Sequence, residues 1–171
     1  ALHRAVSMTL FKNRSYKLLL SATAISNLGD GVSALAFPWL ATLITRDPVL
    51  IATVAFASKL PWFLLSIPAG AWVDRADRQR LMVRADLIRM VLTSCVIALI
   101  LWIPSFPLGS GEGVYIAILS VLAFLLGTAE VLRDNAAQTV LPSIVDKPQL
   151  ETANGQLWTA EQVMGQFVGP P

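Results

Sequence analysis

The sequence predicts an all-α, polytopic bundle of membrane-spanning helices, and two observations lead to this fold class. Hydrophobic residues make up 55% of the 171 residues and charged residues only 14%, a balance far from that of soluble domains. Several apolar stretches are also long enough to cross a hydrocarbon core, which takes about 20 helical residues. The chain is therefore expected to need lipid as its solvent.

The expected spans follow one another with short connections. They cover about residues 18–45, 49–73, 82–103 and 114–133, and a fifth, incomplete span is expected over 154–171. The first run is too long for the apolar core of a signal peptide and is not followed by a small-residue cleavage pattern. We therefore interpret it as a retained span, with residues 1–17 as a tail.

The basic residues between the spans predict the orientation in the membrane. Lysine and arginine gather in the tail and again between residues 75 and 84, whereas the loop at 46–48 has one arginine and the loop at 104–113 has no basic residue. Cytoplasmic loops carry the excess of Lys and Arg. We expect a multi-pass protein of the cell membrane with a cytoplasmic N-terminus.

Residues for other kinds of chemistry are scarce. His3 is the only histidine and Cys95 the only cysteine, which excludes histidine-based triads, the usual zinc sites and an intrachain disulfide. The net charge of +2 is spread over short loops, a distribution that does not favour nucleic acid. We expect no enzyme, no metal, no cofactor and no nucleic-acid partner, and the lipid bilayer as a partner.

The connection between the second and third spans carries a specific motif. Residues 70–80 read Gly-Ala-Trp-Val-Asp-Arg-Ala-Asp-Arg-Gln-Arg and resemble the Gly-x-x-x-Asp-Arg-x-Gly-Arg-Arg/Lys loop of the major facilitator superfamily. Gly70, Asp74, Arg75 and Arg78 match position by position, whereas Asp77 stands where the family usually has glycine. The resemblance implies a latch between two halves of a transporter; the alternative is a solvated charge run.

A second motif lies at the end of the chain. Gly165-Gln-Phe-Val-Gly169-Pro170 resembles the Gly-x-x-x-Gly-Pro signature of helix five in drug:proton antiporters. Two glycines four residues apart leave a groove for a facing helix, and Pro170 removes a backbone donor and bends the axis. Together these residues can control closure of an outer gate, so the motif favours export over uptake.

The resemblance covers nearly the whole chain and is closest to bacterial drug and macrolide exporters of this superfamily. It implies proton-coupled, secondary active export of drug-like or other small amphipathic molecules by alternating access. Residues 1–171 would then be an incomplete N-terminal six-helix domain, with substrate, protons and the missing C-terminal half as partners. The alternative is a non-transporting or truncated facilitator-like protein with a receptor or partner-binding role.

Charged residues within the spans are the candidate coupling site, because each is costly near the bilayer centre unless paired or hydrated. Helix rise places Asp30 and Lys59 both about 20 Å from the cytoplasmic boundary, on neighbouring antiparallel helices. We expect them to face each other. They could form a static ion pair, or a pair that alternates with protonation or with a cationic substrate.

A second charged cluster is expected nearer the cytoplasmic side. Asp86 and Arg89 in the third span lie at a similar depth to Glu130 and Arg133 in the fourth. Glu130 and Asp134 are four residues apart and therefore share one helical face. The sequence leaves two roles open for Glu130, which are transfer of the coupled proton and structural pairing.

The resemblance joins the inner end of the fourth span to the loop motif, as a relay from Asp134 through Arg78 to Asp74. The family's pattern of an arginine followed four residues later by glycine is absent, since Ala137 follows Arg133. The candidates for proton coupling are Asp30 and Glu130, and the expected intramembrane charge partners are Lys59, Asp86, Arg89 and Arg133.

Overall fold

The computed structural model describes residues 10–103 and 111–169, and nearly all of them are helical. The helices are α2 (Arg14–Ile44), α3 (Pro48–Arg75), α4 (Arg78–Trp102), α5 (Glu112–Ile144) and α6 (Leu150–Gln162). A 3-10 turn, η1 (Lys147–Gln149), precedes α6, and a π-helical segment, η2 (Val163–Val168), continues it. These residues contain no strand. The predicted all-α class is confirmed.

Short polar residues set the start of most long helices. The side chains of Asn13, Asp47 and Asp77 accept hydrogen bonds of 2.8 to 3.2 Å from backbone N–H groups in the first turns of α2, α3 and α4. Such caps satisfy donors that have no partner within the helix. α5 instead follows Gly111, whose φ of 79° is a conformation that suits glycine.

Four helices, α2 to α5, are long and apolar enough to cross a membrane, as the sequence predicts. The apolar run of the last one was expected to end near residue 133, but α5 continues to Ile144. No helix-breaking residue occurs between 133 and Pro142, and Ala136, Ala137 and Leu141 are buried along this extension. The extension therefore packs inside the bundle and leads directly to α6.

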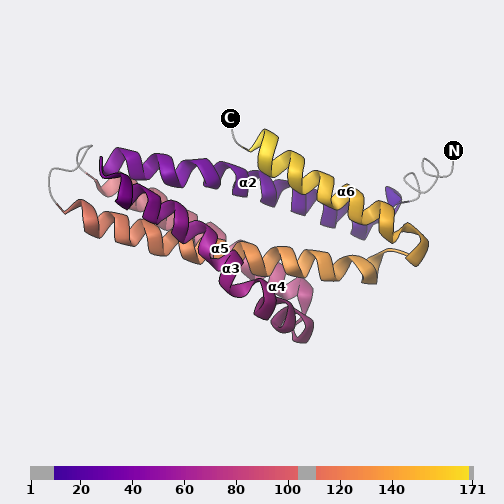
Figure 1. The fold of residues 1–171 in the computed structure, drawn as a ribbon. Coiled ribbons are helices and arrows are strands. Elements are labelled where there is room, and N and C mark those ends of the chain that lie inside the picture. The colour runs from indigo at the N-terminus through magenta and orange to yellow at the C-terminus, as the bar shows by residue number, and fades with distance from the viewer. Residues whose placement is uncertain (1–9, 104–110, 170–171) are drawn as a thin grey trace.

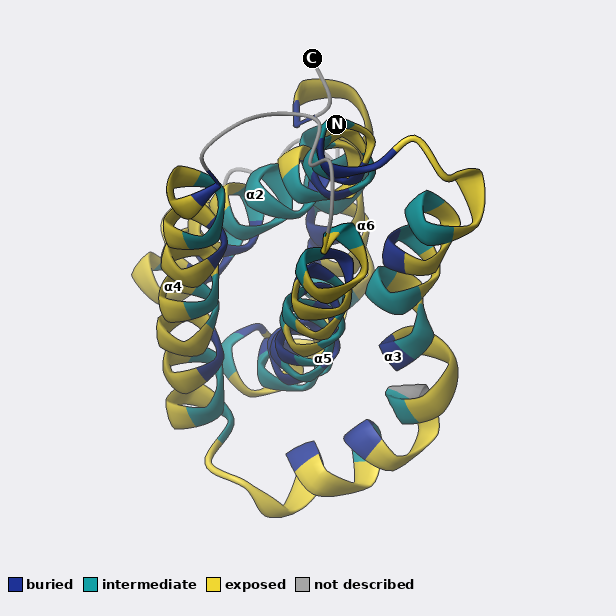
Figure 2. Ribbon diagram, turned by 90° about the vertical axis from the view of Figure 1, so that its left-hand side faces the viewer, coloured by how far each residue is buried: buried dark blue, intermediate teal, exposed yellow. Residues whose placement is uncertain are grey.

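α5 is the central helix of the bundle. It packs against α3 and α4 and also contacts α2 and α6, and Figure 2 shows it between α4 and α3. Successive helices run in opposite directions (Figure 1). The start of α2, the α3–α4 connection and the α5–α6 turn therefore lie at one end of the bundle, and the α2–α3 turn lies at the other.

Two clusters of buried apolar side chains occupy the two ends of α5. The cluster at its start joins α2, α3 and α4 and contains Phe37, Ala41, Ile44, Val54, Val96, Ile103, Ile116, Leu119 and Ala123. The cluster at its end joins the start of α2 and α6 and contains Leu10, Tyr16, Leu19, Ala137, Leu141, Val145, Ala153 and Leu157. The charged stretch of α5 lies between the two clusters.

A glycine allows α5 to approach α3 closely beside this charged stretch. A Cβ atom built on Gly127 would lie 2.6 Å from the carbonyl oxygen of Ser58 and 3.1 Å from Cγ of Pro61. Small residues at such crossings let helix backbones come close together in membranes. The contact places the middle of α3 against the middle of α5.

Candidate functional site

An ion pair between α2 and α4 lies at the centre of the candidate site. Arg89 on α4 donates hydrogen bonds to the carboxylate of Asp30 and to the hydroxyl of Ser26, both on α2. The side chains of Arg89 and Asp30 are only 14% and 13% exposed. The two opposite charges therefore lie mostly buried in the bundle and neutralise each other there.

The partner of Asp30 differs from the expected one. We expected Lys59, but within the described residues Asp30 pairs with Arg89 and Lys59 forms no ion pair within 4 Å. Equal depth does not fix the direction in which a side chain leaves the helix axis. α3 packs mainly against α5, so its lysine is placed by that contact and not by α2.

Arg133 on α5 is completely buried and links three helices. Its Nε lies 3.6 Å from the carboxylate of Asp86 on α4, and its Nη1 lies 3.4 Å from Asp134 and donates to the hydroxyl of Thr23 on α2 at 3.3 Å. Asp86 also lies 3.7 Å from Arg89. The network therefore runs without a break from the α2–α4 ion pair to the end of the charged stretch on α5.

Glu130 completes a group of three neighbouring carboxylates. Oxygen atoms of Asp30, Glu130 and Asp134 all lie within 4.8 Å of one another. The positive charge of Lys59 on α3 acts electrostatically on Glu130. Unlike the two aspartates, Glu130 has no ion pair within 4 Å in the part of the chain that the structure describes.

Three carboxylates at this spacing can share a proton or a cation. Two ionised carboxylates at the upper limit of this spacing, 4.8 Å, repel each other by about 3.5 kcal/mol at an effective dielectric constant of about 20, and closer ones repel more strongly. Uptake of one positive charge relieves this repulsion. Arginines already hold one oxygen of Asp30 and one of Asp134, so the arrangement suits a proton better than a metal ion.

A fourth carboxylate, Glu161 on α6, faces the same network and was not expected from the sequence. The charges of Asp134 and Arg133 act on it, and its Oε1 is buried without a hydrogen-bond partner among the described residues. A depth comparison would have found it. Helix rise places Glu161 and Asp134 both about 15 Å from the α5–α6 turn.

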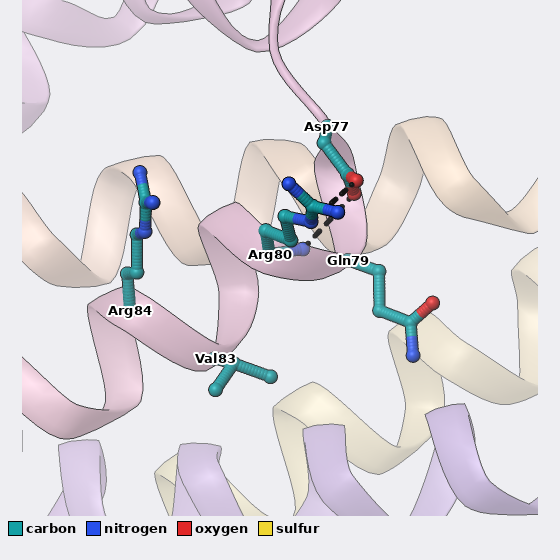
Figure 3. A pocket seen from close by; sticks show the side chains of 5 residues that line it. All are labelled: Asp77, Gln79, Arg80, Val83 and Arg84. Atoms are coloured by element: carbon teal, nitrogen blue, oxygen red, sulfur yellow. Dashed lines mark hydrogen bonds and ion pairs between the residues drawn. The ribbon is translucent and has the colours of Figure 1, made fainter.

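The loop motif forms the short break between α3 and α4. Asp77 caps α4 with a φ of −68°, so this position does not need the glycine that is usual in the family. Figure 3 shows its carboxylate directed at Arg80, and the two side chains lie 3.1 Å apart. They flank an open hollow lined by Asp77 and residues from the start of α4. A Cβ at Gly70 would meet no atom within 4 Å, and Arg75 is exposed.

The relay implied by the resemblance is not formed in this structure. Arg78 lies 3.9 Å from Asp74 and donates a hydrogen bond of 3.1 Å to the carbonyl oxygen of Thr139 on α5. Asp134 pairs with its neighbour Arg133 instead of Arg78. α5 continues as a helix beyond Asp134, and Arg78 contacts it at Thr139, more than one helical turn past Asp134.

The helix-five motif packs directly against α2. A Cβ on Gly31 would overlap the carbonyl group of Gly165 and lie 3.0 Å from Cα of Gly169. The contacting segment is the π-helical η2, and such wider turns are often found at functional positions. The facing helix that two spaced glycines predict is therefore α2. Pro170 lies outside the described residues.

The chain is similar to known membrane transporters. A family model described as transmembrane secretion effector matches residues 5–160. The multidrug efflux pump Tap of Mycolicibacterium fortuitum is 30% identical over 167 residues, which are 95% of this chain and 39% of the relative. Tap of Mycobacterium tuberculosis is 30% identical over 151 residues, 88% of this chain and 32% of the relative.

A more distant relative is named for a different substrate. The staphyloferrin A transporter of Staphylococcus aureus is 24% identical over 131 residues, which are 77% of this chain and 31% of the relative. No solved structure matches the chain. The chain spans about a third to two fifths of the length of these relatives.

Proposed function

Since the chain belongs to the transmembrane secretion effector family of the major facilitator superfamily, we propose that it is the N-terminal part of a secondary active exporter. It is a multi-pass membrane protein, and the proteins it is similar to are transporters and not enzymes. The names of the Tap relatives support export of drug-like or other small amphipathic molecules. They favour transport over a receptor role.

The proposed mechanism is proton-coupled alternating access across the cell membrane. The N-terminal half of such a transporter rocks against a C-terminal half around a site near the bilayer midplane. Arg75 is exposed and a Cβ at Gly70 would meet no atom within 4 Å, so both positions are open to contact with that second half. We place the end of the bundle that carries the start of α2 and the α3–α4 connection in the cytoplasm, because the basic residues gather there.

The single observation that supports proton coupling is the position of Glu130. It is one of three carboxylates whose oxygen atoms lie within 4.8 Å of one another but, within the described chain, it has no arginine partner. Asp30 and Asp134 both have arginine partners in this arrangement, so Glu130 is the carboxylate of the group best placed to exchange a proton. A neutral Glu130 removes one repulsive charge from the group, and an ionised Glu130 draws on the positive charges of Lys59 and Arg89.

The experiment compares two kinds of transport in proteoliposomes that contain the full-length transporter, with ethidium as the probe. Glu130→Gln should abolish uphill ethidium efflux driven by an imposed pH gradient and leave downhill ethidium exchange measurable, because only the protonation step is lost. Glu112→Gln, the same change at the start of the same helix, should leave both rates as in the wild type.

Three other results would each change the proposal. Normal gradient-driven efflux by Glu130→Gln would remove this residue from the coupling mechanism and make Asp30 the leading candidate. A parallel fall of expression, thermal stability and both transport modes would assign Glu130 a structural role. A wild-type protein that moves no ethidium in either direction would oppose the multidrug export function itself.

A further inference from the structure

Arg133 has more hydrogen-bonding capacity than its observed partners use. Its side chain is fully buried, yet Nε and Nη2 have no hydrogen-bond partner among the described residues. The 3.6 Å between Nε and Asp86 is an ion-pair distance, too long for a hydrogen bond. A buried guanidinium with free N–H groups is costly. A second acceptor near the guanidinium would satisfy these donors.

Glu161 on α6 has the complementary shortage. Its Oε1 is buried and accepts no hydrogen bond from any described residue. The charged side chains that act on it are Arg133 and Asp134, both on α5. A guanidinium with free donors and a carboxylate with a free acceptor form strong charge-assisted hydrogen bonds when they meet.

α6 is attached to α2 more firmly than to α5. The hydroxyl of Tyr16 on α2 donates a hydrogen bond of 2.7 Å to Gln156 on α6, and Gly31 contacts the backbone of η2. Contacts between α6 and α5 are sparser, and Figure 1 shows α6 lying along α2. Movement of α2 and α6 as one unit against α5 would change the distance between Glu161 and Arg133.

We propose that Glu161 is a second carboxylate partner of Arg133, and that the arginine passes from Asp134 to Glu161 when α2 and α6 approach α5. This inference rests on the proposed function, because it adds a positioning residue to the same exporter. Nε and Nη2 are the donors free to reach Glu161, and turning them toward it draws Nη1 away from Asp134, which lies 3.4 Å from it. The exchange therefore links the movement of α6 to the charge state of the carboxylate group.

The first test measures transport by the full-length protein in proteoliposomes, with ethidium as the probe and an imposed pH gradient. Glu161→Gln should lower the efflux rate by about tenfold, a usual size for coupling between two sites. Glu161→Asp keeps the charge and should restore an intermediate rate. Glu151→Gln, at an exposed acid on the same helix, should keep the wild-type rate. Wild-type efflux by Glu161→Gln would overturn the proposal.

A double-variant comparison separates this role from a structural one. Arg133→Gln and the combined variant with Glu161→Gln should have the same residual efflux rate, since residue 161 acts only through the arginine. Rates that multiply would mean that the two residues act independently, and would overturn the exchange. Apparent Tm values in detergent should be close for Glu161→Gln and the wild type.

The second test does not depend on transport. In a Cys95-free full-length protein, spin labels at the exposed positions Gln138 on α5 and Thr159 on α6 report the distance between these helices. We expect two distances in the wild type and one in Glu161→Gln. A single wild-type distance at every pH, or two distances kept in the variant, would overturn the exchange even if export is sound. Loss of one distance in a protein without efflux would support the exchange and refute the export function.

Discussion

Alanine in place of Gly31 should separate α2 from the π-helical segment η2. The added Cβ would overlap the carbonyl group of Gly165 and lie 3.0 Å from Cα of Gly169. These are backbone atoms, so no side chain can rotate out of the way. The two helices must move apart by about 0.5 to 1 Å to reach an ordinary carbon–carbon contact distance.

The size of the effect follows from a comparison with Gly29 on the same helix. A methyl group forced into a packed interface costs about 1 to 3 kcal/mol. The Cβ of alanine at Gly29 would have Arg89 as its nearest neighbour, at an unstrained 4.0 Å. Replacing glycine by alanine within a helix stabilises both variants equally, by up to about 1 kcal/mol, because alanine has the higher helix propensity. Gly31→Ala should therefore be about 1 to 3 kcal/mol less stable than Gly29→Ala.

The assay is denaturant unfolding of the purified full-length protein in detergent, followed by circular dichroism. Gly155→Ala is a second control, because its Cβ would have no atom within 4 Å. The free energy of unfolding should rise or stay level in both controls and fall in Gly31→Ala. If Gly31→Ala is as stable as Gly29→Ala, the α2–η2 contact is not close in the protein and the gate assigned to it loses its structural basis.

Two further predictions concern the ion pair and the topology. Asp30→Asn should lower the stability of the full-length protein more than Asp30→Asn combined with Arg89→Met. The single change leaves the buried Arg89 without its partner, which costs about 3 to 5 kcal/mol. Equal Tm values for the two variants would show that the ion pair contributes little. In a Cys95-free background, cysteine at Gly111 should react with a membrane-impermeant maleimide on intact cells and cysteine at Ala76 only after permeabilisation, and the reverse pattern would invert the proposed orientation.

The loop motif shows how far a pattern of residues predicts local structure. The matched positions correctly indicate a short charged connection, and the Asp77 cap explains how the turn forms without the usual glycine. The pattern could not predict that Arg78 would reach Thr139. That contact depends on how far α5 continues past its apolar run, which helix capping and packing decide and hydropathy does not.

The sequence by itself determined the helical membrane class, the long helices and the depth of each buried charge. These properties follow from local rules, since lipid offers the backbone no hydrogen-bond partners and helix rise is constant. Only the tertiary structure decided which charges meet. Asp30 pairs with Arg89 and not with Lys59, and the charges of Arg133 and Asp134 act on Glu161. The rotation of each helix about its own axis depends on contacts between distant segments, such as Gly31 against η2, and no spacing along a single helix contains that information.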